Sequence, residues 1–155
     1  MTESKKSLNQ IIKFRLDKLN KVYDHGVDPY PQKFEPKHNN NEIVCDFINF
    51  ENKDVTIAGR IMSMRAMGSA SFFTIQDHKG RVQIFLKKDN VGEKKYDLFK
   101  LLDIGDFIGI NGIVFKTKVG EVTVRANDFT ILSKSIRPLP VVKEKDGQVY
   151  YAFNN

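Results

Sequence analysis

The pattern of hydrophobic and polar positions changes its period at about residue 54. Over residues 8–25, apolar residues recur three and four positions apart, which predicts an amphipathic helix. Ser7 and Gln10 have the spacing of a capping box, in which each side chain accepts a hydrogen bond from a backbone N–H at the helix start. Gly26, which readily adopts the left-handed conformation, is expected to end the helix.

Residues 28–54 show no clear period and contain three prolines, so we interpret them as a connector. Apolar residues near its end are expected to anchor it to a core, through a short helix at 42–48. The N-terminal unit is therefore predicted to be a helix and a connector over residues 1–54.

From residue 55 onward the pattern alternates and is rich in β-branched and aromatic residues. It predicts five strands: Val55–Met64, Ser71–Gln76, Val82–Leu86, Phe107–Phe115 and Val122–Leu132. A helical spacing over Glu93–Leu102 separates the third strand from the fourth. This order is that of an OB-fold, a five-stranded Greek-key barrel. We therefore predict a mainly β fold, with a helix between strands three and four and an N-terminal α-helix before the barrel.

The binding surface of an OB-fold includes the outer face of strands two and three. Phe73 and Ile75 belong to the apolar set that must fill the barrel, so alternation places Phe72, Gln83 and Phe85 on the outer face. A phenylalanine ring can stack on a nucleobase, and a glutamine can hydrogen-bond to the base edge. The alternative is that Phe72 or Phe85 packs under a loop or under the N-terminal helix, and the pattern leaves both readings open.

Two loops beside this face add charged candidates. Strict alternation would turn Arg65 into the barrel, so we predict a bulge or a strand end near it. The loop between strands four and five contains Glu121 and two lysines. The candidates for contact with an RNA backbone are the lysines of this loop and of the first helix: Lys116, Lys118, Lys13 and Lys18.

Composition changes this picture only slightly. The 155 residues include 25 Lys and Arg against 19 Asp and Glu, a net charge of +6 that weakly favours an acidic partner. A single cysteine, Cys45, excludes an internal disulfide, and we expect its side chain to be buried. The three histidines lack the spacing of a metal site. No segment has the length of a membrane helix or the form of a signal peptide, so we predict a cytoplasmic protein.

The motifs carry a specific resemblance. GRIMSMRAMGSASFFTIQDHKGRVQIFL (59–86) and LFKLLDIGDFIGINGIVFKTKVGEVTVRANDFTILSKSIRPLP (98–140) resemble the anticodon-binding domain of class II lysyl-tRNA synthetases. RLDKLNKVYDHGVDPYPQKF (15–34) is similar to the helix and proline turn that open that family. The aspartyl and asparaginyl relatives share the Phe and Gln of the outer face, but they lack segments like MGSASFF, FKTKVGE and RPLP.

The resemblance implies a role for four residues. Phe72 matches the aromatic residue that stacks on the middle uridine of the anticodon, and Gln83 matches the side chain that reads the edge of that base. Arg65 matches an arginine that contacts the anticodon. Glu121 matches an acidic loop residue near an outer anticodon base. The implied partner is the U-rich anticodon stem-loop of tRNA-Lys.

The resemblance also implies a parent enzyme, a homodimeric lysine–tRNA ligase that uses ATP and magnesium. Residues 55–140 would be its anticodon-binding domain, and 141–155 a linker toward a catalytic domain. The class II catalytic motifs are absent from this sequence, so we assign it no catalytic or metal-binding residue. Two other functions remain open: an OB module that binds single strands without sequence preference, and a protein-interaction domain that binds no nucleic acid.

Overall fold

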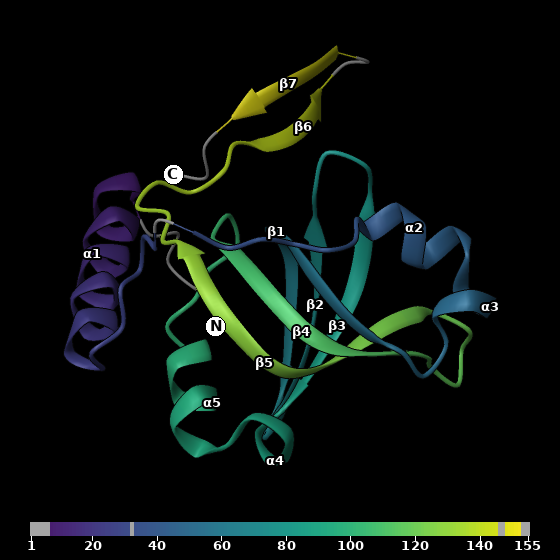
Figure 1. The fold of residues 1–155 in the computed structure, drawn as a ribbon. Coiled ribbons are helices and arrows are strands. Elements are labelled where there is room, and N and C mark those ends of the chain that lie inside the picture. The colour runs from purple at the N-terminus through teal and green to yellow at the C-terminus, as the bar shows by residue number, and fades with distance from the viewer. Residues whose placement is uncertain (1–6, 32, 146–147, 153–155) are drawn as a thin grey trace.

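A closed five-stranded barrel forms the centre of the computed structural model (Figure 1), which describes residues 7–31, 33–145 and 148–152. Its strands are β1 (Asp54–Met67), β2 (Ala70–Gln76), β3 (Arg81–Lys87), β4 (Phe107–Lys116) and β5 (Val122–Ser133). They neighbour one another in the order β1-β2-β3-β5-β4, and β4 pairs back onto β1. Only β3 and β5 pair in parallel among these strands. The predicted OB-fold is confirmed.

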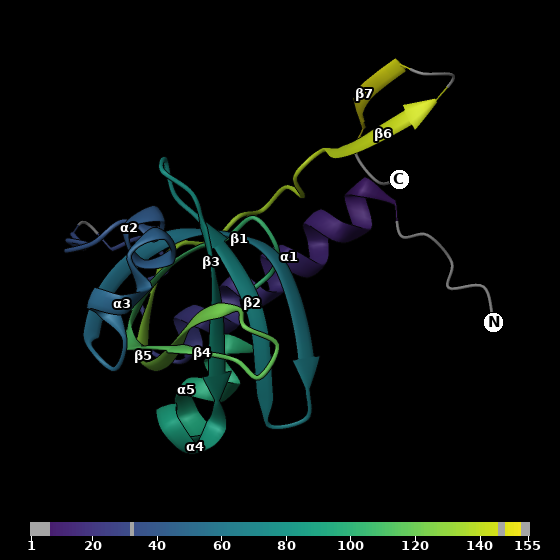
Figure 2. The same cartoon turned by 90° about the vertical axis from the view of Figure 1, so that its right-hand side faces the viewer.

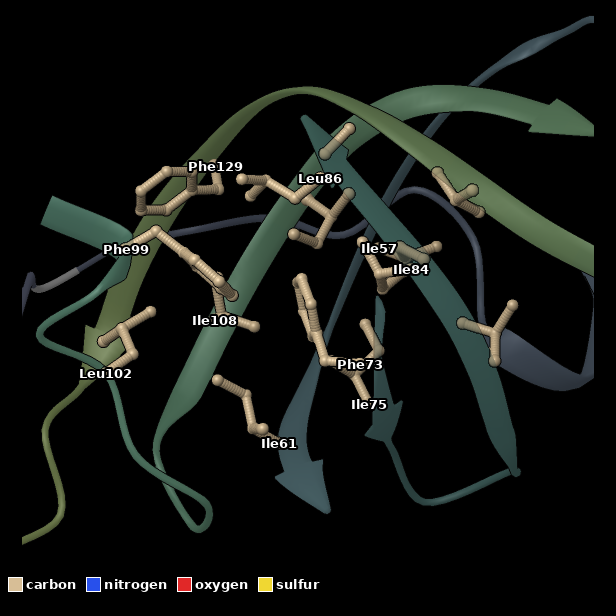
Figure 3. Close-up of a cluster of buried hydrophobic side chains, with 14 of the residues drawn as sticks. Ile57, Ile61, Phe73, Ile75, Ile84, Leu86, Phe99, Leu102, Ile108 and Phe129 are labelled. Atoms are coloured by element: carbon tan, nitrogen blue, oxygen red, sulfur yellow. The ribbon is translucent and has the colours of Figure 1, made fainter. Parts of the chain in front are cut away.

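The barrel interior is filled by alternate side chains of every strand. Figure 3 shows Phe73, Ile75 and Ile84 directed into this core, and each is at most 1% exposed. Burying a side chain of this size stabilises a fold by about 1.5–3 kcal/mol. Because β2 places Phe73 and Ile75 inside, Phe72 must face outward, and the predicted strand register is confirmed.

Two short helices, α4 (Lys88–Val91) and α5 (Glu93–Phe99), close one end of the barrel. The ring of Phe99 lies 5.0 Å from that of Phe73 and 6.0 Å from that of Phe129, measured between centroids. The sequence pattern predicted one helix over Glu93–Leu102. The helix ends three residues earlier, because the chain after Phe99 turns toward β4, and α4 was not predicted.

The N-terminal helix α1 (Leu8–Asp24) begins at the predicted capping box of Ser7 and Gln10. It ends before Gly26, whose φ of 73° is in the left-handed region. The helix is tied to the barrel by polar contacts from its inward side. The guanidinium of Arg15 donates hydrogen bonds to the backbone oxygens of Ile104, at 3.1 Å, and Arg137, at 3.3 Å.

Beside this contact lies an anchor cluster of four charged residues: Lys18, Asp103, Asp106 and Lys134. Lys18 Nζ is 2.8 Å from Asp103 Oδ1, and the fully buried Nζ of Lys134 is 2.9 Å from Oδ2 of both aspartates. Burial would raise the pKa of Asp103, but its hydrogen bonds and charge interactions with the two lysines lower it overall. For Asp106, which is fully buried and shares only Lys134, burial prevails and raises the pKa.

The connector contains two short helices, α2 (Asn40–Cys45) and α3 (Phe47–Phe50), in place of the single one predicted at 42–48. Asn39 caps α2, and the buried Asn40 donates to the backbone oxygens of Ile75 and Gly80. These bonds hold α2 against the β2–β3 hairpin. The prediction that Cys45 is buried was wrong: its thiol is exposed and donates to Asn41 Oδ1 at 3.3 Å, because α2 turns Ile43 toward the core instead.

Upstream of α2, the connector runs over the outer surface of β1 and β4. The backbone N–H of Lys37 donates to the Thr56 oxygen at 2.9 Å. The ring of Phe34 sits directly on the backbone of Gly109, where any Cβ would collide with it. A glycine in β4 is therefore what permits this close approach.

The tail forms a hairpin of its own. Strands β6 (Val141–Lys145) and β7 (Gln148–Ala152) pair antiparallel with each other and join no strand of the barrel. Figure 2 shows this hairpin projecting away from the barrel. The sequence analysis interpreted residues 141–155 as a linker and assigned no strand to them.

Candidate nucleic-acid interface

The outer surface of β2 and β3 carries a pair of stacked rings. The centroids of Phe72 and Phe85 are 4.8 Å apart, with their planes inclined by 35°. Both side chains are half-buried, and Phe72 lines an open cleft. Because Phe72 lines this cleft, the alternative in which a loop or α1 covers the ring does not hold for Phe72. We call this surface, with its flanking loops, the interface face.

A bulge in β1 turns Arg65 onto this face. The β1–β2 register shifts between Ile61 and Ser63, so residues beyond the bulge exchange sides. Arg65 then lies opposite Phe72, and its guanidinium carbon is 5.7 Å from the centroid of that ring. The bulge that the sequence analysis required is confirmed.

The cleft beside these side chains has a volume of about 300 Å³. It is lined by Ser63, Met64, Arg65, Phe72, Phe73, Thr74 and Gln83. The hydroxyls of Ser63 and Thr74 hydrogen-bond to each other at 2.7 Å across β1 and β2. The cleft thus combines an aromatic wall, a cation and an amide, the groups that single-stranded nucleic acid needs for stacking and edge contacts.

The carboxamide of Gln83 lies close to Thr123 of β5. Thr123 lies opposite Gln83 in the parallel β3–β5 pairing, and its Oγ1 is 3.5 Å from Gln83 Oε1. The same hydroxyl donates to the backbone oxygen of Glu121 at 3.1 Å. Sequence reasoning missed Thr123, because a buried threonine in a strand has no local signal for a role at a site.

The loop between β4 and β5 places Glu121 and Lys118 in solvent at the edge of the face. The backbone N–H of Thr117 donates to the backbone oxygen of Glu121 at 3.0 Å, and this hydrogen bond closes the loop. The side chain of Lys116 already has a contact within the fold. Its Nζ lies 4.7 Å from the centroid of the Phe47 ring of α3, a cation–π contact.

The structure does not bring the two lysines of α1 to the interface face. Figure 2 shows α1 behind the barrel when β2 and β3 face the viewer. Lys18 is engaged by Asp103, as described above, and Lys13 is exposed on α1. Neither shares the cleft of Phe72 and Gln83.

Two further residues of the face were missed. The Phe115 ring of β4 lies 6.4 Å from that of Phe85, and Arg125 of β5 is exposed opposite Phe85 in the register. Alternation in β4 and β5 contained the signal, because the neighbours Val114 and Val124 are core residues. The face therefore has three rings, an amide and a rim of cations.

Two features are absent from the part of the chain that the structure describes: a metal-binding cluster and a helix that could cross a membrane. Their His, Cys, Asp and Glu side chains form no group of three or more that could hold a metal ion. None of the helices that the structure describes is long and apolar enough to cross a membrane.

Comparison with known proteins gives one family and a set of relatives. The family model for tRNA anti-codon OB-fold nucleic acid binding domains matches residues 55–132, the barrel itself. Lysine–tRNA ligases of Thermoanaerobacter sp. (strain X514), Pelotomaculum thermopropionicum and Bacillus subtilis are 53%, 50% and 42% identical to this chain over 134, 133 and 140 residues. Each match covers 86% of this chain, which spans about a quarter of the relatives' length (26–28%).

Proposed function

The chain belongs to the family of OB-fold nucleic acid binding domains, and we propose that it is the anticodon-binding domain of a lysine–tRNA ligase. The observation that carries this proposal is the stacked pair of Phe72 and Phe85, with the carboxamide of Gln83 on the same face. Rings supply affinity for any base, whereas an amide held in place can distinguish one base edge from another.

In the proposed complex, Phe72 stacks on the middle base of a U-rich anticodon and Gln83 hydrogen-bonds to its edge. Arg65 contacts the same loop, and Glu121 lies near an outer base. Phe85 extends the stacking surface, and the lysines of the β4–β5 loop attract the phosphates. The partner is the anticodon stem-loop of tRNA-Lys, whose bases are splayed in a single-stranded loop and are therefore accessible.

The whole enzyme would attach lysine to tRNA-Lys with ATP and magnesium, as a homodimer in the cytoplasm. The proposal places the chemistry outside this chain, which spans about a quarter of the length of the relatives. Within this chain we propose residues 55–140 as the recognition domain. Residues 1–54 would form its N-terminal helix and connector, and 141–155 the link to the rest.

The test is a titration of the protein with anticodon stem-loops that differ only in the middle base. We expect the tightest binding with uridine. Gln83→Ala should bring the four affinities together, because it removes an edge reader and leaves the stacking rings intact. Equal binding of all four loops by the wild type would contradict the proposal.

A second function is favoured by one observation. Phe115 adds a third ring to Phe72 and Phe85, and such a row is typical of modules that bind single strands without sequence preference. If the wild type binds an unstructured oligonucleotide as tightly as any stem-loop, this second function becomes the better account. A protein-interaction domain would bind neither.

A further inference from the structure

A second cleft opens on the outer surface of the barrel next to the β2–β3 turn. It has a volume of about 320 Å³ and is lined by Arg60, Met62, Gln76, Asp77, His78 and Phe107. Three barrel strands and the turn contribute to it, so its shape is fixed by the fold. The proposed function assigns none of these residues a role.

The guanidinium of Arg60 is held in place without a charged partner. Its central carbon lies 4.5 Å from the centroid of the Phe107 ring, a cation–π contact that fixes the side chain against β4. Its Nε is buried and has no hydrogen-bond partner, and no carboxylate in the described part of the chain pairs with it. Buried polar atoms in proteins are nearly always hydrogen-bonded, so this exception calls for an explanation.

The acidic residue of the cleft is already engaged. Asp77 Oδ1 accepts the backbone N–H groups of Lys79, at 2.8 Å, and Gly80, at 2.9 Å. Its Oδ2 accepts the N–H of Asn40 at 2.9 Å. Asp77 therefore shapes the turn and anchors α2, and it does not form an ion pair with Arg60.

A second cation stands at the edge of the cleft. Arg81 Nε donates to Gln76 Oε1 at 2.8 Å, and Gln76 is part of the lining. Arg81 does not line the cleft itself, so Arg60 is the guanidinium group of its lining.

The cleft continues the interface face along β1 and β2, which contribute residues to both clefts. In the β1–β2 register Arg65 lies opposite Phe72, and Arg60 lies opposite Gln76. Gln76 lies four positions after Phe72 in β2, which corresponds to about 13 Å at roughly 3.3 Å per residue. An OB-fold engages about 4–16 nucleotides, so a strand seated on Phe72 extends beyond the first cleft.

We propose that the cleft at Arg60 is a second RNA-contact site, in which Arg60 binds the backbone phosphate of a nucleotide next to those on the interface face. This rests on the proposed function. Guanidinium N–H groups match phosphate oxygens in geometry and charge, and Arg60 lines the cleft with one face of its guanidinium on the Phe107 ring. The site recognises the backbone, so it adds affinity without adding base preference.

Arg60→Gln tests this assignment. Binding to the stem-loops is measured over a series of salt concentrations. We expect weaker binding for all four middle bases by the same factor. The slope of log affinity against log salt should become less steep by about 0.7, the value expected when one fewer phosphate of a single strand is neutralised.

Lys94→Gln is the matched control. It removes the same charge from α5, which follows the far end of β3, and should leave the slope unchanged. Arg60→Lys keeps the charge and should keep the slope. The assignment is overturned if Arg60→Gln binds like the wild type, if Lys94→Gln changes the slope equally, or if Arg60→Gln loses middle-base preference.

A second measurement locates the phosphate itself, and its wild-type half does not depend on any variant folding. Replacing single phosphates of the stem-loop by neutral methylphosphonates should reveal one sensitive phosphate outside the three anticodon nucleotides, and Arg60→Gln should be insensitive to it. Finding no such phosphate on the wild type would also overturn the assignment. If the wild type shows no middle-base preference, the proposed function fails. A slope change by Arg60→Gln on an unstructured uridine oligonucleotide would then still support the phosphate site.

Discussion

The anchor cluster and the interface face both concentrate charged side chains on one barrel, but they treat those charges oppositely. In the anchor cluster, Lys134 is fully buried and is paired with two carboxylates at 2.9 Å. On the interface face, Arg65 and Arg125 form no ion pair with any residue that the structure describes. The first arrangement satisfies every charge within the fold, whereas the second leaves cations beside half-buried rings.

The difference separates structural charges from charges available to a ligand. Removing a buried charge from its partners leaves the partners uncompensated, and this cost falls on stability. Removing an unpaired surface cation costs the fold little, and the loss falls on binding to an anion. Variants in the two regions should therefore change different measurements.

The largest effect is expected for Lys134→Met. Methionine keeps most of the volume but leaves Asp103 and Asp106 without their shared lysine, so we expect a loss of about 3–5 kcal/mol in the free energy of unfolding. Denaturant titration at pH 7 measures it. The control is Lys100→Met, which removes an exposed ion pair with Asp97 and should cost at most about 1 kcal/mol. Equal stability of the two variants would erase the contrast between buried and exposed pairs.

The pH dependence of stability should identify Asp103 as a group with a lowered pKa. Asp103→Asn is expected to cost about 1.5–3 kcal/mol at pH 7, the usual contribution of hydrogen bonds to a charged group. Because the folded-state pKa is lowered, this contribution is present above the ordinary value of 3.8 and is lost as the pH falls through the folded value. The stability difference between wild type and variant should therefore begin to shrink below about pH 5 and continue to shrink as the pH falls through the lowered folded value. A difference that stays constant over this range would contradict the assignment.

Phe72→Ala should change binding while leaving the anchor cluster intact. We expect anticodon stem-loop affinity to fall by about 1–3 kcal/mol, the usual result of removing one stacking ring. Isothermal titration with the uridine stem-loop measures this effect. Leu16→Ala, a half-exposed residue of α1 away from the interface face, is an apolar truncation that should bind like the wild type. The stacking role is refuted if both variants retain full affinity.

The smallest effect concerns single surface lysines. Lys118→Gln should lower affinity for all stem-loops about equally and reduce the salt slope by about 0.7, because Lys118 has no partner in the described residues. Lys100→Gln removes the same charge from a lysine that Asp97 already neutralises, 3.7 Å away. It should leave the slope unchanged. Identical slopes for the two variants would show that pairing within the fold does not decide which cations meet RNA.

Sequence alone predicted the barrel and much of its outer face for one physical reason. Alternation in a half-buried strand couples each core residue to an outward neighbour, so placing Phe73 inside placed Phe72 outside. The same logic located the bulge, because a charged Arg65 could not enter the core. It also missed Phe115 and Arg125 only because the pattern was followed in β2 and β3 and not in β4 and β5.

The anchor cluster could not be predicted in this way. Lys18 and Asp103 are 85 residues apart, and neither has a local pattern that names the other. Lysine is almost never fully buried, so nothing in the sequence marked Lys134 as an interior residue. The same holds for Arg60, whose role depends on a ring that β4 brings beside it. Pairings set by the tertiary fold are beyond the reach of short-range periodicity.

The close approach of Phe34 to Gly109 has a consequence for the order in which the molecule is made. Phe34 leaves the ribosome 75 residues before the glycine on which it sits. At about 5–20 residues per second, roughly 4–15 s pass between the synthesis of Phe34 and that of Gly109. During this interval the ring of Phe34 has no Gly109 to pack on, because β4 must be synthesised before it can pair with β1. The segment synthesised first is thus among the last to dock, and the N-terminal helix becomes fixed only when the barrel is nearly complete.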